Sequence, residues 1–326
     1  MSTSGILIEQ TLSIFIILLT GVICYRTKLI DDDSNKKLTN ILLTLAQPIL
    51  IFTSFQMDFD IDLVVGLLIS LVLAFATHIV AIIISYIFIR KKKRKIIIEN
   101  GVRTVTYVVN EDAEVERLTG SYANMGLMGM PIIYGIYGSV GVFYVTAYII
   151  AFNILMYTHG VIMISGNRKL KFRDIIDRFK SPAIIAIISG IIFFVFQIKL
   201  PKVIYQSLDN ISRIYAPFGM IIAGATIAKT DLIKMLTGNL RRYYIVFLKL
   251  LLVPFVTMLI YVWLPIDETI KMVAIILSAT PTTTIGTLLT IKYNKNSVFA
   301  AEVFAMTTLF SIVTIPFIIM IAELLM

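Results

Sequence analysis

Uncharged apolar runs long enough to cross a membrane make up most of this chain, and the longest extends from Leu118 to Gly166. A helix needs about 20 apolar residues to span the hydrocarbon core of a bilayer. Only 15% of the 326 residues are charged and 58% are hydrophobic, whereas about a quarter of a soluble domain is charged. The runs do not show the two-residue alternation of an outer-membrane barrel. The sequence therefore predicts an all-α polytopic membrane protein.

The apolar runs divide into ten expected transmembrane helices. We place these spans at 5–25, 35–56, 61–89, 118–138, 140–165, 182–198, 205–228, 242–264, 268–291 and 297–325. The first run begins without the basic segment that precedes the core of a secretory signal peptide, so we interpret it as a first span.

The basic residues indicate how these spans are oriented. Of the 29 Lys and Arg residues, all but five lie in or beside the loops after spans 1, 3, 5, 7 and 9; the exceptions are Lys199, Lys202, Arg213, Lys249 and Lys271. The positive-inside rule then predicts that these loops are cytoplasmic and that both termini lie outside the cell membrane. The net charge of +9 is therefore mainly a topology signal, and we expect no nucleic-acid partner. The run RKKKRK at 90–95 is a candidate contact for anionic membrane lipid.

Two of the cytoplasmic loops show patterns of local structure. Ile96–Val109 alternates around Asn100-Gly101, a dipeptide that favours a two-residue hairpin turn. Phe172–Phe179 spaces its apolar residues on one helical face, which predicts an interfacial helix leading into span 6. Neither loop has the features of a separate domain.

The fourth and ninth spans contain residues that interrupt helices. The fourth reads SYANMGLMGMP at 121–131, and the ninth reads SATPTTTIG at 278–286. Proline lacks a backbone donor and clashes with the preceding turn, while glycine lowers the steric cost of unwound backbone. Unwound backbone at membrane depth is tolerated where it is buried in protein or lines a polar cavity. We therefore expect two broken crossover helices; the alternative is a pair of ordinary kinks.

The two halves of the chain also resemble each other elsewhere. LTNILLTLAQP at 38–48 in span 2 matches LDNISRIYAP at 208–217 in span 7. Because each half has five spans, the second half would be inverted, which predicts a first inverted repeat at 1–165 and a second at 166–326. Inverted repeats with paired interrupted helices are typical of secondary transporters whose binding site lies at the midplane.

The candidate binding site lies where the two interrupted spans would meet. Half-helix N-termini favour anions, and we expect neutral groups around them to contact a substrate. The candidate substrate-binding residues are Asn124, Met125, Gly126, Asn153, Pro281, Thr282, Thr283 and Thr284. Structural roles at or beside the interruptions are expected for Gly129, Pro131, Pro48 and Pro217. Residues 118–165 and 269–301 contain no Asp or Glu, which argues against an acidic cation site; we expect no metal and no cofactor.

Several polar residues within spans leave alternatives open. His78 and His159 could relay protons or make helix–helix contacts. Arg213 could attract an anion or extend to the membrane surface, and Asn153 could be a hydrogen bond within the bundle. We expect Lys249 to extend to the cytoplasmic surface.

At these residues the chain resembles the auxin efflux carrier family, which includes plant PIN-like carriers and bacterial malate and malonate permease-like proteins. The matching stretches are NMGLMGMP at 124–131, QPILIF at 47–52, FNILMYT at 152–158 and the region from Pro281 to Pro316. The resemblance implies a fold similar to the sodium/proton antiporters and bile-acid transporters. Spans 1, 2, 6 and 7 would then form a scaffold that pairs into a homodimer. Spans 3–5 and 8–10 would form a transport domain with an elevator-type motion.

The chain departs from the family pattern at two places that bear on the substrate. Thr290-Ile291-Lys292 stands where members often have an acidic residue near the end of span 9, and Ile51 stands where PIN carriers tend to have serine. We therefore expect a permease for small organic anions, such as the mono- or dicarboxylates malate or malonate, rather than for auxin.

Three other functions are alternatives to this one. A sodium- or proton-coupled symporter or antiporter would place carboxylates near the crossover. An intramembrane enzyme would need a nucleophile with a base, or paired acids, at membrane depth, and His78 and His159 have no evident acidic partner in the sequence. A non-transporting membrane sensor would need an output module. We therefore expect a carrier and not an enzyme.

Overall fold

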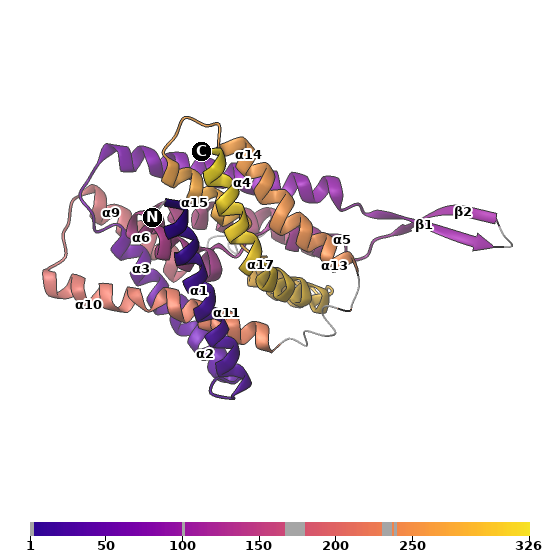
Figure 1. Ribbon diagram of the computed structural model, residues 1–326, viewed down its shortest axis with the longest axis horizontal. Helices are drawn as coiled ribbons and strands as arrows, with labels where there is room; N and C mark the ends of the chain where they lie inside the picture. Colours follow the sequence, from indigo (N-terminus) through magenta and orange to yellow (C-terminus); the bar gives the residue numbers. More distant parts are fainter. Residues whose placement is uncertain (1–2, 100–101, 167–179, 230–236, 238–239) are drawn as a thin grey trace.

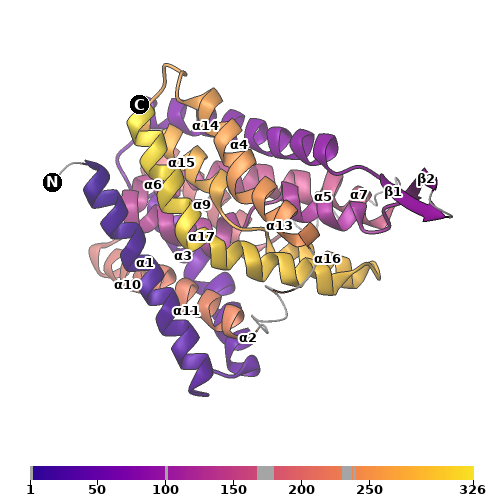
Figure 2. The ribbon, with the colours of Figure 1, turned by 45° about the vertical axis from the view of Figure 1, so that its right-hand side comes forward.

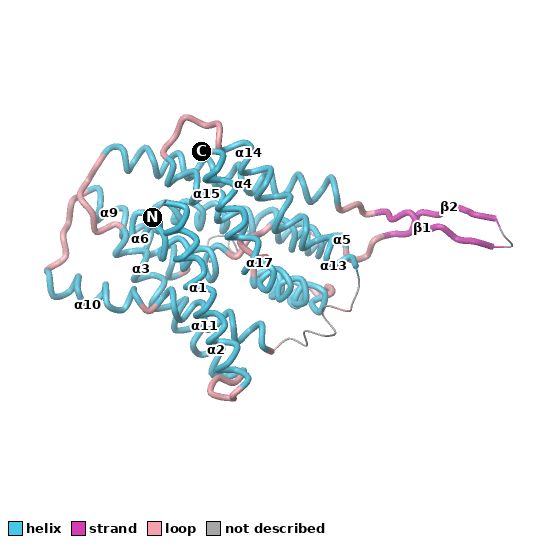
Figure 3. The backbone as a smooth tube through the Cα atoms, in the orientation of Figure 1, coloured by secondary structure: helices cyan, strands magenta, loops and turns pink. Residues whose placement is uncertain are grey.

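The computed structural model describes residues 3–99, 102–166, 180–229, 237 and 240–326, and the regular structure among them is helical apart from one hairpin (Figures 1 and 3). Within these described residues, six helical segments are long and apolar enough to cross a membrane: 32–54, 61–88, 125–165, 202–228, 240–261 and 297–325. Two shorter apolar helices lie at 13–26 and 182–195. The chain is therefore a multi-pass helical membrane protein, as the hydropathy predicts.

The helices of the first half follow one another with few connecting residues. They are α1 (Thr3–Arg26), α2 (Asp32–Ile41), the π-helical turn η1 (Leu42–Ala46), α3 (Gln47–Ser54), α4 (Ile61–Phe88), α5 (Ala113–Ser121), η2 (Met125–Gly129), α6 (Met130–Leu155), η3 (Met156–Gly160) and α7 (Val161–Ser165). Within α6, Gly138 has φ 59° and ψ −145°, a conformation open mainly to glycine. This residue turns the chain between two helical sections where no longer loop intervenes.

The second half contains the remaining helices. They are α9 (Pro182–Val195), α10 (Lys202–Arg213), α11 (Tyr215–Ala228), α13 (Leu240–Phe247), η4 (Leu248–Leu252), α14 (Val253–Tyr261), α15 (Glu268–Ala279), α16 (Thr284–Lys292) and α17 (Ser297–Leu325). Their starts follow ordinary capping chemistry. Ser181 caps α9, which has Pro182 in its first turn, and Asp267 caps α15 by accepting from Thr269 N at 2.9 Å.

The prolines of the matched spans 2 and 7 both lie where a helix is divided. Pro48 follows the π-helical turn η1 at the start of α3, and Pro217 lies in the first turn of α11, just after α10 ends at Arg213. Proline is tolerated in a first turn because the missing N–H has no intrahelical partner there.

The helices α1 and α11 lie side by side and make the most extensive helix–helix contact among the described residues (Figure 2). A Cβ atom on Gly224 would lie 1.9 Å from Leu18 O, and one on Gly21 would lie 2.2 Å from Ile221 O. The two backbones therefore touch, which is how small residues permit tight helix association in membranes. Helices α2, α3, α9 and α10 join this pair, while α4–α7 and α13–α17 pack mainly with one another.

The predicted hairpin is present and extends away from the helices (Figure 1). Strand β1 (Lys92–Glu99) pairs antiparallel with β2 (Val102–Val109), so that Lys92 faces Val109 and Glu99 faces Val102. At its base Arg241 pairs with Asp112 at 3.3 Å and with Glu116. These contacts join the base of the hairpin and α5 to α13. The predicted interfacial helix at 172–179 lies outside the described residues.

Candidate functional site

The interruptions of α5–η2 and α15–α16 lie against each other in the middle of the fold. Ala123 and Thr282 form an isolated antiparallel bridge. Asn124 N donates to Pro281 O at 2.7 Å, and Thr283 N donates to Tyr122 O at 3.1 Å. Two short extended segments, 122–124 and 280–283, thus satisfy each other's backbone groups, which a membrane interior requires. We call these two segments the crossing.

Each interruption leaves a new helix N-terminus beside the crossing. Asn124 caps η2, since its Oδ1 accepts from Leu127 N at 3.3 Å, and Thr283 caps α16, since its Oγ1 accepts from Ile285 N at 3.3 Å. The first amides of a helix have no intrahelical partner and carry partial positive charge. The crossing therefore brings together two ends suited to a negative ligand group.

The amide nitrogen of Asn124 is the most conspicuous polar atom of the crossing. The residue is 4% exposed. While Oδ1 caps the helix, Nδ2 is buried and has no hydrogen-bond partner among the described residues. Leaving a buried donor unsatisfied costs about 1–3 kcal/mol. Nδ2 is thus a donor available to a ligand at the crossing.

At Gly126 the first turn of η2 lies against α3 and α11, which belong to the group of helices packed around α1. Tyr215 Oη, at the start of α11, donates to Gly126 O at 2.7 Å. A Cβ atom on Gly126 would lie 3.1 Å from Gln47 Nε2, at the start of α3. The two groups of helices therefore meet at the N-terminal end of η2, where both partners lie next to the prolines that divide their helices.

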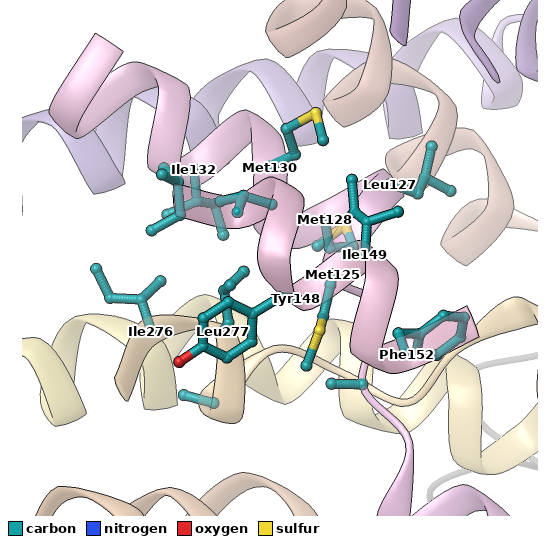
Figure 4. Packing of buried hydrophobic residues seen from close by; sticks show 14 of the residues in the cluster. Met125, Leu127, Met128, Met130, Ile132, Tyr148, Ile149, Phe152, Ile276 and Leu277 are labelled. Carbon is teal, nitrogen blue, oxygen red and sulfur yellow. The ribbon is translucent and has the colours of Figure 1, made fainter. Parts of the chain in front are cut away.

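A buried apolar cluster packs around the interrupted fourth span (Figure 4). Gly129 allows the close approach of α15, because a Cβ there would lie 2.6 Å from Leu277 Cδ2. Met125, Tyr148 and Phe152 belong to the same buried cluster. Hydrogen bonds and charges within such an apolar shell are stronger than in water.

The structure brings most of the predicted residues together, but Asn153 is bonded elsewhere. Asn124, Met125 and Gly126 lie at one interruption, and Pro281, Thr282, Thr283 and Thr284 at the other. The hydroxyl of Thr282 donates to Tyr122 O at 3.4 Å and its N–H donates to Thr307 Oγ1 at 3.2 Å, so this residue holds the crossing together. Asn153 Nδ2 donates to Ile149 O of its own helix at 2.7 Å.

The structural residues have contacts that suit their positions. Gly129 packs on α15, and Pro131 lies buried in the first turn of α6 against the position of Gly219, whose Cβ would lie 3.1 Å from Pro131 Cγ. The described residues contain no group of three or more His, Cys, Asp or Glu side chains placed to hold a metal ion.

The expectation that Lys249 extends to the cytoplasmic surface is wrong. Lys249 is 1% exposed, and its Nζ donates to Ser278 O at 2.9 Å. The lysine lies on the face of η4 that packs on α15, and so its side chain points into the protein rather than along the membrane boundary. Hydropathy gives the depth of a residue but not the face of the helix it occupies.

Three other polar residues within spans have defined contacts. His78 is buried and its Nδ1 lies 2.7 Å from Ala74 O. His159 lies between Tyr122 Oη at 2.9 Å and Tyr86 Oη at 3.3 Å, a helix–helix contact. Arg213 pairs with Asp209 at 2.9 Å on the exposed surface of α10, so its charge is balanced by a carboxylate of its own helix.

Sequence reasoning did not single out Gln47 or Tyr215, and it assigned Lys249 to the cytoplasmic surface instead of the protein interior. The signal for the first two was their place beside Pro48 and Pro217, since a divided helix marks where another segment approaches. The signal for Lys249 was its charge within an apolar span, a feature that indicates function by default.

The fold and the crossing define a multi-pass membrane protein with two broken helices that meet inside the bundle. The family model described as membrane transport protein matches residues 6–319. The chain therefore belongs to this family, which is the auxin efflux carrier family of transporters. A comparison with curated protein sequences gives no significant match.

Proposed function

We propose that this protein is a secondary transporter that moves small organic anions, such as the mono- or dicarboxylates malate or malonate, across the cell membrane. The observation that carries the proposal is the buried, unpartnered Nδ2 of Asn124 beside the N-termini of η2 and α16. An uncharged donor and two positive helix ends suit a carboxylate. Family membership supports transport rather than catalysis.

The helix packing supports an elevator-type mechanism. The group α1, α2–α3, α9, α10 and α11 would be the scaffold, and the group α4–α7 with α13–α17 would be the transport domain that carries the crossing. The two groups meet at Gly126, so movement of one group along the other would open the crossing to each side in turn. We propose that the scaffold also pairs two copies into a homodimer.

The same packing supports an arrangement of ten spans in two inverted repeats. The turn at Gly138 divides the long segment 125–165 into two, and the crossing divides α15 from α16 within a ninth span. The divided helices at Pro48 and Pro217 occupy second place in each half, and the interruptions occupy fourth place. The proposed repeat units are 1–165 and 166–326.

The proposal predicts that a carboxylate binds without sodium. A thermal-shift screen of purified protein would use malate, malonate, citrate, lactate and indole acetate, each in sodium and in choline buffer. A ligand at 100 times its Kd stabilises the folded state by about 2.7 kcal/mol. We expect the best ligand to bind equally in both buffers, because residues 118–165 and 269–301 contain no Asp or Glu that a cation would have to neutralise.

Replacement of the ligand carboxylate by an amide gives the control for charge. We expect at least tenfold weaker binding of the amide, a loss of about 1.4 kcal/mol. A strict sodium requirement would instead support a sodium-coupled symporter. Equal or tighter binding of the amide would rule out an anion site.

The basic loops also predict the orientation of the protein. In a Cys24→Ser background, which removes the single cysteine of the chain, we would place single cysteines by Asp58→Cys and by Glu111→Cys. The Asp58 side chain is 98% exposed, and Glu111 is exposed at the base of the hairpin. An impermeant maleimide applied to intact cells should label the first variant only. Labelling of Glu111→Cys without permeabilisation would invert the topology.

A further inference from the structure

Lys249 is a fully buried lysine within the group of helices that carries the crossing. Its element η4 packs against α4, α5, α15 and α17, whereas the scaffold helix α11 contacts η2. Lys249 Nζ contacts Ser278 O at 2.9 Å, and Ser278 precedes Pro281 of the crossing by one helical turn. The ammonium group therefore approaches the crossing along the end of α15.

The hydrogen bond with Ser278 accounts for only part of this arrangement. Helix α15 ends at Ala279, so its last carbonyls have no intrahelical partner, and a cation there balances the negative end of the helix dipole. One carbonyl satisfies only one of the three ammonium donors and supplies no full counter-charge. A buried charge without a partner is strongly unfavourable, so the protein tolerates Lys249 at the expense of stability.

The acidic residues on the helices around η4 are paired elsewhere or lie away from Lys249. Glu116 of α5 pairs with Arg241, Glu114 with Lys91, and Glu302 of α17 with Arg242 at 2.8 Å. Among the described residues, no carboxylate forms an ion pair with Lys249. The remaining titratable or charged groups on these helices are Asp62, His78, Tyr86, Arg117, Tyr243, Tyr244, Tyr261, Glu268, Lys271 and Glu323.

We propose that Lys249 is the resident positive charge of the binding site, and that the carboxylate held at the crossing is its missing counter-charge. This inference rests on the proposed function and deepens it. Lys249 acts on the substrate through the last turn of α15. It also moves with the transport domain, so its charge stays beside the crossing whether the crossing is open to the outside or to the cytoplasm. A built-in cation also explains how an anion can bind without a coupled sodium ion.

The test separates charge from helix capping by means of three variants. Lys249→Met removes the charge and the donor, Lys249→Gln keeps a donor for Ser278 O without the charge, and Lys249→Arg keeps the charge. Lys271→Met is the matched control, because Lys271 is another buried lysine, at the opposite end of α15, where it donates to Val262 O at 3.4 Å. The probes are malonate and its uncharged diamide malonamide, with affinities measured calorimetrically on the purified full-length protein.

We expect Lys249→Met and Lys249→Gln to weaken malonate binding at least tenfold while malonamide binding changes less than threefold. Lys249→Arg should retain the preference for malonate, and Lys271→Met should behave as the parent does. Without any ligand, Lys249→Met should melt at the same temperature as the parent or higher, because it removes an uncompensated buried charge.

Other results would overturn the inference. An equal loss of both probes in Lys249→Met, together with a lower melting temperature, would make Lys249 a helix cap only. Undiminished malonate preference in Lys249→Gln would remove its charge from the site. Failure of the parent to bind any of the screened acids would defeat the proposed function, and this inference with it, whereas the first two results defeat this inference alone.

Discussion

Replacing Asn124 by aspartate should abolish transport while leaving the fold intact. The Asp side chain keeps an oxygen that can accept from Leu127 N, as Asn124 Oδ1 does at 3.3 Å, so the N-cap of η2 is retained. The variant loses the Nδ2 donor and gains a negative charge where a carboxylate should bind. We expect carboxylate affinity to fall at least tenfold, about 1.4 kcal/mol, and uptake into proteoliposomes to fall to background.

Two comparison variants complete this experiment. Asn124→Ala loses both the donor and the cap, so it should also reduce thermal stability, since an N-cap contributes about 1 kcal/mol. Asn40→Asp places the same change on the exposed surface of α2 and should leave affinity unchanged. Parental affinity in Asn124→Asp would exclude Nδ2 from the binding site.

Replacing Gly224 by valine should prevent the scaffold from assembling. A Cβ atom at this position would lie 1.9 Å from Leu18 O and 2.9 Å from Val22 N, which are backbone atoms of α1. Side-chain adjustment cannot relieve such an overlap, so the two helices must separate. Overpacking of this kind typically costs about 1–3 kcal/mol and occasionally more. We expect a large loss of monodisperse protein after detergent extraction and a lower melting temperature.

Gly286→Ala is the matched control for a glycine within a helix. Its Cβ would meet its nearest neighbour, Thr283 Cγ2, at 3.6 Å, which is ordinary van der Waals contact. This variant should be as stable as the parent. If Gly224→Val matched it in yield and melting temperature, the close contact of α1 and α11 would not be needed for the fold.

The sequence predicted where the two helices are interrupted because each residue that interrupts a helix acts locally, through its own backbone chemistry. Pro281, the glycines around Met125 and the absence of acids at 118–165 and 269–301 are local features. The hairpin at Asn100-Gly101 was predictable for the same reason, and its strands pair in the expected manner.

The partners of these residues could not be predicted because they depend on how helices are rotated against each other. Tyr215 reaches Gly126 O across two groups of helices, and Lys249 faces α15 rather than the membrane boundary. A single sequence indicates where a span lies in the membrane and which residues share a helix face. The rotation of that helix about its own axis depends on how it packs against its neighbours. Asn153 illustrates the converse case, since a polar residue of suitable depth donates within its own helix.

The bridge between Ala123 and Thr282 also bears on how the protein is made. Thr282 and Tyr122, which it contacts, are 160 residues apart, so the ribosome releases the first interruption long before the second exists. Until then Tyr122 O and Asn124 N lack the partners that they have in the finished fold, and lipid cannot supply them. Until the second interruption has been synthesised, these backbone groups in the first half therefore need hydrogen bonds from water or from another protein, such as the insertion machinery. The crossing therefore forms only after the ninth span has been synthesised, late in the insertion of the chain.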